Sequence, residues 1–266
     1  MLIDAFSSGL FEQIDACTRN LNAQRHLHLL IDGAFSPGLH GAIEENRKAL
    51  LFSLRPGCSE EAKDVSPFVT PFDPVSKKLR MLWDRCNRWP MLSVIETPET
   101  FDQLAARLAA WCVVEADGQR FNFRFADTRR LPAIFHILSP RQRGEFAGPA
   151  TRWLYVNRYG QWDELQGDCR GGSGAVGPVL DERQFACLVD DSKADELLVL
   201  LRDRGHDVFG VPSRSHTLLT IALGAALKGK LADEDLLRWC EWFWKQDELH
   251  DDGVAIELLQ SWRTGS

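Results

Sequence analysis

The chain has 266 residues, of which 44% are hydrophobic and 26% charged, so it can bury a sizeable core and is not a disordered tail. Its 31 basic and 38 acidic residues give a net charge of −7, without the basic excess typical of tight nucleic-acid binding. The longest nearly apolar run, 217–227, is far shorter than the roughly 20 residues that cross a bilayer. We therefore expect neither nucleic acid nor a membrane among the partners.

The start of the chain and the cysteines indicate the compartment. The first residues lack the basic stretch of a secretory signal, and Asp4 interrupts the apolar ones. The 7 cysteines stand singly, without a C-x-x-C pair, which is typical of reduced thiols rather than a disulfide framework. We expect a cytoplasmic protein.

The first 90 residues predict helices and short strands in alternation. Apolar residues three or four positions apart indicate amphipathic helices, and short apolar runs that end at glycine or proline indicate strands. The elements expected here are a helix over 4–24, a strand over 26–32 that ends at Gly33, a helix over 39–48, a short strand over 49–54, an extended piece near 68–69 and a helix over 75–86.

The middle of the chain carries clearer caps and turns. Thr97-Pro98 predicts the N-cap and first position of a helix, and Ser139-Pro140 followed by Gln142 predicts a capping box. Asp117-Gly118 suits the positive φ angles of a tight hairpin turn. The elements expected here are a strand over 91–96, a helix to about 110, a hairpin of 111–115 and 120–125, helices over 131–138 and from Ser139, and a strand pair of 153–156 and 161–165.

Composition changes abruptly after residue 166. Five glycines fall within 167–178, which disfavours a regular element there, and every later pattern is helical. The sequence therefore predicts an α+β fold: a mixed α/β N-terminal lobe with a small sheet over 1–166, a glycine-rich connector over 167–180 and an all-helical C-terminal lobe over 181–266. The helices expected in this lobe begin at Asp181 and cover 194–204, 215–228, 233–249 and 254–262.

Two patterns are read as structural rather than as cofactor or metal sites. Residues 172–177 match G-x-G-x-x-G by letters, but Pro178 follows and no strand–turn–helix unit surrounds them, so we interpret them as part of the connector. His26, His28 and Asp32 share one strand face, but a zinc site needs three or four converging ligands and no further His or Cys cluster is near in sequence. We expect a polar strand face, no metal and no cofactor.

Two groups are candidates for binding a partner. Arg124, Asp127 and Arg129 form a dense charged group at a strand end, either as an Arg–Asp fork that fixes the strand to the next helix or as an anion clamp. In the helix over 233–249, Trp242 projects among charged residues, and Trp239 lies at the margin of the apolar stripe. An exposed Trp either packs on a neighbouring helix or anchors a protein partner, because Trp and Arg dominate interface hot spots.

A known family shows a similar order of motifs. The chain has Leu29-Leu30-Ile31-Asp32-Gly33-Ala34, a strand with Ser93, the hairpin that leads into Phe123-Arg124-Phe125-Ala126-Asp127-Thr128-Arg129, and Phe146-Ala147-Gly148-Pro149. Over roughly 27–149 this order resembles the effector-chaperone, or adaptor, family of bacterial type VI secretion systems. Ala126 and Thr128 replace an aromatic residue and a proline that are common in the family, so only Arg124, Asp127 and Arg129 keep that motif.

The resemblance implies a non-enzymatic cytosolic binding protein. Its partners would be a secreted toxic effector and the VgrG-type spike protein onto which the effector is loaded. From the position of Trp242 on a charged helix face, we expect the helical lobe, together with the facing surface of the α/β lobe, to hold the effector, with Trp242 among the anchors. No catalytic constellation is evident in the sequence. The competing interpretation is a small hydrolase-like enzyme that uses a pair of the scattered Cys and His residues, which would meet only in the fold.

Overall fold

The computed structural model describes residues 2–19, 21–165, 178–246, 248 and 250–265, and these form two compact units. The sheet unit comprises Ala5–Leu188, and the helical unit comprises Met1–Asp4 with Val189–Ser266. This confirms the α+β class with an all-helical C-terminal region. The units divide within a helix, whereas most of the predicted connector over 167–180 lies outside the described residues. The limits 1–166 and 181–266 therefore stay a prediction.

The sheet unit is built on six strands in the order β2-β3-β1-β4-β7-β8, with every neighbouring pair antiparallel. This sheet is larger than the small sheet expected. Its strands are β1 (His26–Ile31), β2 (Ala49–Leu50), β3 (Phe68–Pro71), β4 (Leu92–Thr97), β7 (Arg152–Val156) and β8 (Trp162–Glu164). A second sheet has the order β6-β5-β9, formed by β5 (Val113–Ala116), β6 (Gln119–Asn122) and β9 (Val179–Leu180).

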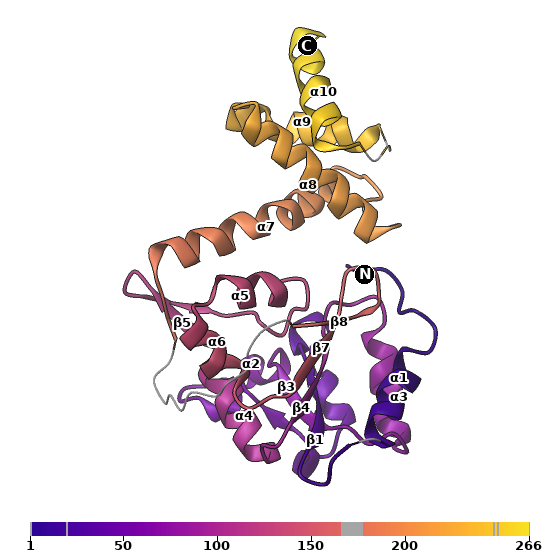
Figure 1. Cartoon of the computed structure of the whole chain (residues 1–266), viewed down its shortest axis with the longest axis vertical. Coiled ribbons are helices and arrows are strands. Elements are labelled where there is room, and N and C mark those ends of the chain that lie inside the picture. Colours follow the sequence, from indigo (N-terminus) through magenta and orange to yellow (C-terminus); the bar gives the residue numbers. More distant parts are fainter. Residues whose placement is uncertain (1, 20, 166–177, 247, 249, 266) are drawn as a thin grey trace. The chain divides into compact units, whose positions relative to one another are not determined.

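Helices cover both faces of the six-stranded sheet (Figure 1). On one face lie α1 (Leu10–Arg19) and α3 (Lys77–Cys86). The rings of Phe11 and Trp83 meet there edge to face, with their centres 5.0 Å apart. On the other lie α4 (Phe101–Ala110) and α6 (Pro140–Ala147), whose core centres on Phe146. Further helices in the described part of this unit are α2 (Glu60–Asp64) and α5 (Leu131–Ile137).

The helical unit contains most of α7 (Glu182–Asp203), together with α8 (Pro212–Lys228), α9 (Asp233–Lys245) and α10 (Asp252–Gly265). Trp239 and Phe243 of α9 are completely buried, and the Trp239 indole donates to the Ala222 carbonyl of α8 at 2.9 Å. The N-terminus completes this unit: Ile3 is buried, and the Asp4 carboxylate accepts from the Ser213 backbone N–H at the start of α8.

The predicted caps and turns were confirmed at most positions. Asp117 and Gly118 both have positive φ angles in the β5–β6 turn, and Ser139 and Gln142 form the expected capping box. The expected Thr97 cap was wrong. Helix α4 begins three residues later, where Thr100 and Gln103 form the capping box, while the Thr97 hydroxyl accepts from the Glu99 backbone N–H.

The expected helix over 39–48 was also wrong. The segment forms two 3-10 turns, Leu39–Ala42 and Glu45–Arg47. The buried Lys48 ammonium donates to the carbonyls of His40 and Ile43, both at 3.1 Å, and so takes acceptors that a continuous helix would use.

Three other elements are shorter than expected. The predicted strand over 49–54 is a strand only at Ala49–Leu50 and then turns into Phe52–Leu54. The first helix covers Leu10–Arg19 rather than 4–24, because Ser7 is bonded through its backbone to Gly160 and Gly9 has a left-handed φ of 80°. Helix α9 ends at Lys245 rather than at 249.

Candidate partner-binding site

The charged group at the end of the β5–β6 hairpin folds into a buried fork. The Arg129 guanidinium grips the Asp127 carboxylate with two hydrogen bonds, Nε to Oδ1 at 3.0 Å and Nη2 to Oδ2 at 2.8 Å. The Asp127 side chain is only 2% exposed and also accepts from the Arg129 backbone N–H. Such bidentate, charge-assisted pairs are stronger and more directional than ordinary hydrogen bonds. The fork therefore fixes the turn that precedes α5.

Arg124 joins this turn to the end of β1. Its Nη2 donates to Asp32 Oδ2 at 2.9 Å and lies 3.9 Å from Asp127 Oδ2. Asp32 also caps the 3-10 turn after β1 by accepting from the Ala34 backbone N–H. Burial raises the pKa of Asp32, and the positive charge of Arg124 opposes that rise. Two segments 92 residues apart in sequence are thus held together by one guanidinium.

Two aromatic side chains complete the group, which we call the arginine–aromatic cluster: Phe35, Trp89, Arg124 and Arg129. The guanidinium carbons of Arg124 and Arg129 lie 5.1 and 5.6 Å from the centre of the Phe35 ring, within cation–π range. Trp89 stacks on Phe35 with ring centres 6.0 Å apart. Both rings are partly exposed, and so is 48% of the Arg124 side chain.

The predicted Arg–Asp fork is therefore present, between Arg129 and Asp127. The third predicted residue, Arg124, keeps part of its side chain exposed to solvent. Sequence reasoning missed Phe35 and Trp89. Their places in the sequence gave a weak signal, since Phe35 lies in the 3-10 turn Gly33–Phe35 just after β1 and Trp89 lies just before Pro90 and β4. Nothing in the sequence, however, brings these two loops together.

The second predicted group lies on α9 and divides into a buried and a half-buried tryptophan. Trp239 is 0% exposed, so it lies in the core and not at its margin as expected. Trp242 is only partly exposed, and its ring stacks on Trp239 with centres 5.5 Å apart and planes 22° apart. Of the two, only Trp242 has surface available for a partner.

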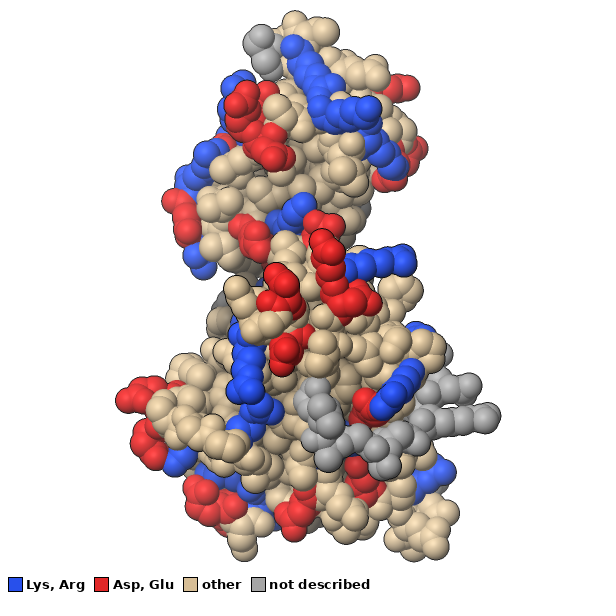
Figure 2. All heavy atoms as spheres, turned by 90° about the vertical axis from the view of Figure 1, so that its left-hand side faces the viewer, with Lys and Arg blue, Asp and Glu red and all other residues tan. Residues whose placement is uncertain are grey.

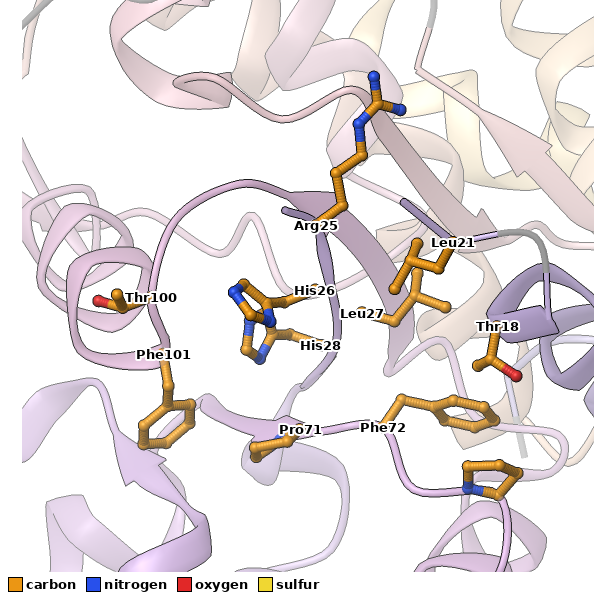
Figure 3. Close-up of a pocket in the computed structure, with 11 residues that line it drawn as sticks. Thr18, Leu21, Arg25, His26, Leu27, His28, Pro71, Phe72, Thr100 and Phe101 are labelled. Carbon is orange, nitrogen blue, oxygen red and sulfur yellow. The ribbon is translucent and has the colours of Figure 1, made fainter. Parts of the chain in front are cut away.

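A separate pocket of about 500 Å³ opens at the N-terminal end of β1 (Figure 3). His26 and His28 point from one side of the strand toward the start of α4, whereas Leu27 points to the other side. His28 is 3% exposed, and desolvation, together with the neighbouring His26, lowers its pKa to about 4. The imidazole is therefore neutral at neutral pH.

The cysteines that the hydrolase interpretation requires are poor nucleophiles where they are buried. Desolvation raises the pKa values of Cys86, Cys112 and Cys240 to about 12, so their thiols stay protonated at neutral pH. The Sγ atoms of Cys86 and Cys112 donate to the carbonyls four residues earlier, as in a packed helix. None of the described residues that line the histidine pocket is a cysteine.

The described part of the chain shows neither a metal-binding group nor a membrane-spanning helix. There, no three His, Cys, Asp or Glu side chains gather as a metal site, and no helix has the length and apolarity to cross a bilayer. The face in Figure 2 shows basic and acidic side chains interspersed on each unit. The glycines of 172–177 lie outside the described residues.

Comparison with models of protein families found a match for part of the chain. Residues 27–145 match the model of a family described as a domain of unknown function (DUF4123), close to the range 27–149 over which the motifs show their resemblance. The match covers less than half of the chain, and the family is associated with effector adaptors of type VI secretion systems. No curated protein and no solved structure matched the chain.

Proposed function

We propose that the protein is a non-enzymatic cytoplasmic adaptor that binds one type VI secretion effector and helps to load it onto a VgrG-type spike protein. The observation that carries the proposal is the match over residues 27–145, because the matched family is associated with such adaptors and is not a known enzyme family. The matched segment also contains the whole arginine–aromatic cluster, so a built and partly exposed surface coincides with the family region.

The arrangement suggests different tasks for the predicted binding residues. Arg124 has an exposed guanidinium beside two partly exposed rings, the side-chain types that dominate interface hot spots. Asp127 is buried, the Arg129 side chain is 12% exposed, and their fork holds the turn beside Arg124 in place. On the helical unit, Trp242 would contact the effector and Trp239 would support it from below.

The proposal is tested by purifying the tagged full chain from its native host and identifying the bound proteins by quantitative mass spectrometry. We expect one large effector and a VgrG-type protein to be enriched in stoichiometric amounts. Recovery of neither protein under conditions in which the secretion system is expressed contradicts the proposal.

The contact residues are tested once that effector is purified. Arg124→Gln removes the exposed charge and should weaken effector binding about tenfold, since hot-spot truncations cost more than about 1 kcal/mol. Arg141→Gln, in which an 87% exposed side chain of α6 loses its charge, is the matched control and should leave the dissociation constant unchanged. Equal affinities for both variants, measured by calorimetry, would remove the arginine–aromatic cluster from the interface.

A further inference from the structure

The histidine pocket contains a polar side chain whose ring nitrogens are left unpaired by the described residues. Both ring nitrogens of His28 are buried and have no hydrogen-bond partner among the described residues. Leaving a buried donor or acceptor unpaired costs about 1–3 kcal/mol, so most buried polar groups are paired. His28 points into the pocket rather than into the core behind it (Figure 3).

The walls around His28 are aromatic and apolar. The Phe101 ring centre lies 6.0 Å from that of His28, and Pro71 faces His28 across the β1–β3 pair. On the other side of β1 the pocket continues over Leu21, Leu27 and Phe72. Pockets of this size with apolar walls and few polar groups are typical of small-ligand sites, in which the polar groups fix the orientation.

The electrostatics of the pocket favour an uncharged ligand. His28 is neutral at neutral pH because burial opposes its charged form. The nearby cation Arg25 is paired with Glu96 at 2.8 Å, and Glu99, which is close enough to influence His28, is held by Arg107. An ionic ligand group would lose its hydration without gaining an unpaired counter-charge.

A neutral imidazole offers one donor and one acceptor, and a hydroxyl offers the same pair. We propose that this pocket binds a phenolic group, with its ring against Phe101 and Pro71 and its hydroxyl hydrogen-bonded to His28. Aromatic rings gain from offset or edge contacts with one another. Because neither His28 nitrogen touches solvent, the hydroxyl reaches one of them only when a side chain that lines the pocket moves.

A phenolic group has two sources, a free small molecule or a tyrosine side chain of a bound polypeptide. The proposal does not rest on the adaptor function, since the full chain can be titrated with small probes in the absence of any effector. The probes are p-cresol, which is the tyrosine side chain, and toluene, which lacks only its hydroxyl. N-acetyltyrosine amide serves as the third probe and separates the two sources.

We expect the full chain to bind p-cresol about tenfold more tightly than toluene, the size of one net hydrogen bond to a group that is otherwise unpaired. His28→Phe should abolish this preference while it retains toluene binding, and His26→Ala should keep it. The matched control is His136→Phe, on the exposed face of α5, which should leave both affinities unchanged.

A second measurement uses only the wild-type chain, so it does not depend on whether a variant folds. In spectra of imidazole nitrogens, p-cresol should shift the His28 signals and toluene should not. Binding of N-acetyltyrosine amide assigns the pocket to a polypeptide side chain, and its exclusion assigns the pocket to a free phenol. Equal affinities of p-cresol and toluene for the wild-type chain, or an unchanged preference in His28→Phe, would overturn the proposal.

Discussion

Among the described residues, the sheet unit buries more charged side chains than the helical unit does. The described sheet unit encloses His28, Asp32, Lys48 and Asp127, each less than 9% exposed, and nearly all of them are fixed by charge-assisted bonds. Within its described part, the helical unit buries one charged side chain, Asp195, which is 7% exposed, and its core cluster consists of aliphatic and aromatic side chains and one cysteine. Buried charges seldom add stability over an apolar core but fix specific geometry when fully paired. Specific recognition is therefore to be sought first in the sheet unit.

The units also differ in what holds them together along the chain. In the sheet unit, Arg124 bridges two distant loops and the sheet joins strands from across the sequence. In the helical unit, α8 packs on both α9 and α10, and the only described segment that comes from far away in sequence is the N-terminus. Changes in the two units should consequently have separable effects.

The largest effect is expected from Trp239→Ala, which tests whether the helical unit depends on apolar packing. Removing this fully buried ring should lower the free energy of unfolding of the helical unit by about 4 kcal/mol. Trp242→Ala, the matched control on the same helix, should cost about 1–2 kcal/mol because only part of its ring is buried. Denaturation followed by tryptophan fluorescence measures both, and equal losses would contradict the packing described.

Asp127→Ala tests whether the sheet unit depends on its paired charges. The substitution leaves the mostly buried Arg129 guanidinium without the carboxylate that it grips, so it should lower the free energy of unfolding by about 3 kcal/mol. The control Glu164→Gln breaks the more exposed pair with Arg152 and should cost less than about 1 kcal/mol. The double variant Asp127→Ala/Arg129→Met also removes the unpaired charge, so it should regain part of the lost free energy of unfolding. If it regains none, the fork is not what stabilises the turn.

Asp4→Ala tests whether the N-terminus belongs to the helical unit. Asp4 caps α8 from outside the helix, so its loss should cost about 1 kcal/mol in the transition of the helical unit alone. Asp15→Ala, which breaks an exposed pair within α1, is the control and should cost only about 0.3 kcal/mol. A loss confined to the sheet unit would assign the N-terminus to that unit instead.

The smallest effect concerns the surface charges of the helical unit. Hydrogen bonds from Lys245, Arg204 and His206 lower the pKa of Glu241 to about 2 from its ordinary 4.5. Since the pKa is depressed in the folded state, the stabilisation is present above pH 4.5 and is lost as the pH falls toward 2. Glu241→Gln should lower the free energy of unfolding by about 1 kcal/mol at pH 6, and the difference between the variant and the wild type should be smaller at pH 3. A difference that does not change with pH would show that Glu241 acts through packing.

Local signals in the sequence predicted much of the fold. Hairpin, capping box and amphipathic helices follow from neighbouring residues, as Asp117-Gly118 and Ser139-Gln142 show. The failures arose where a second nearby signal overrode the expected one: Lys48 bonds carbonyls of the predicted helix, and the capping box at Thr100 displaces the cap expected at Thr97.

The candidate site was predictable only in part. Arg124, Asp127 and Arg129 are close in sequence, so their fork could be foreseen, but the partner Asp32 and the rings of Phe35 and Trp89 come from other loops. Trp239 was misplaced because a helical projection gives a direction and not the depth to which neighbouring helices cover it.

Effector delivery tests the adaptor function most directly. In a strain that lacks the gene for this protein, secretion of each type VI effector is measured by quantitative mass spectrometry of the culture supernatant. The adaptor proposal predicts that one effector is lost, that the others are secreted at normal levels, and that the wild-type chain restores the missing one. Normal secretion of every effector, or loss of all of them together, would contradict it.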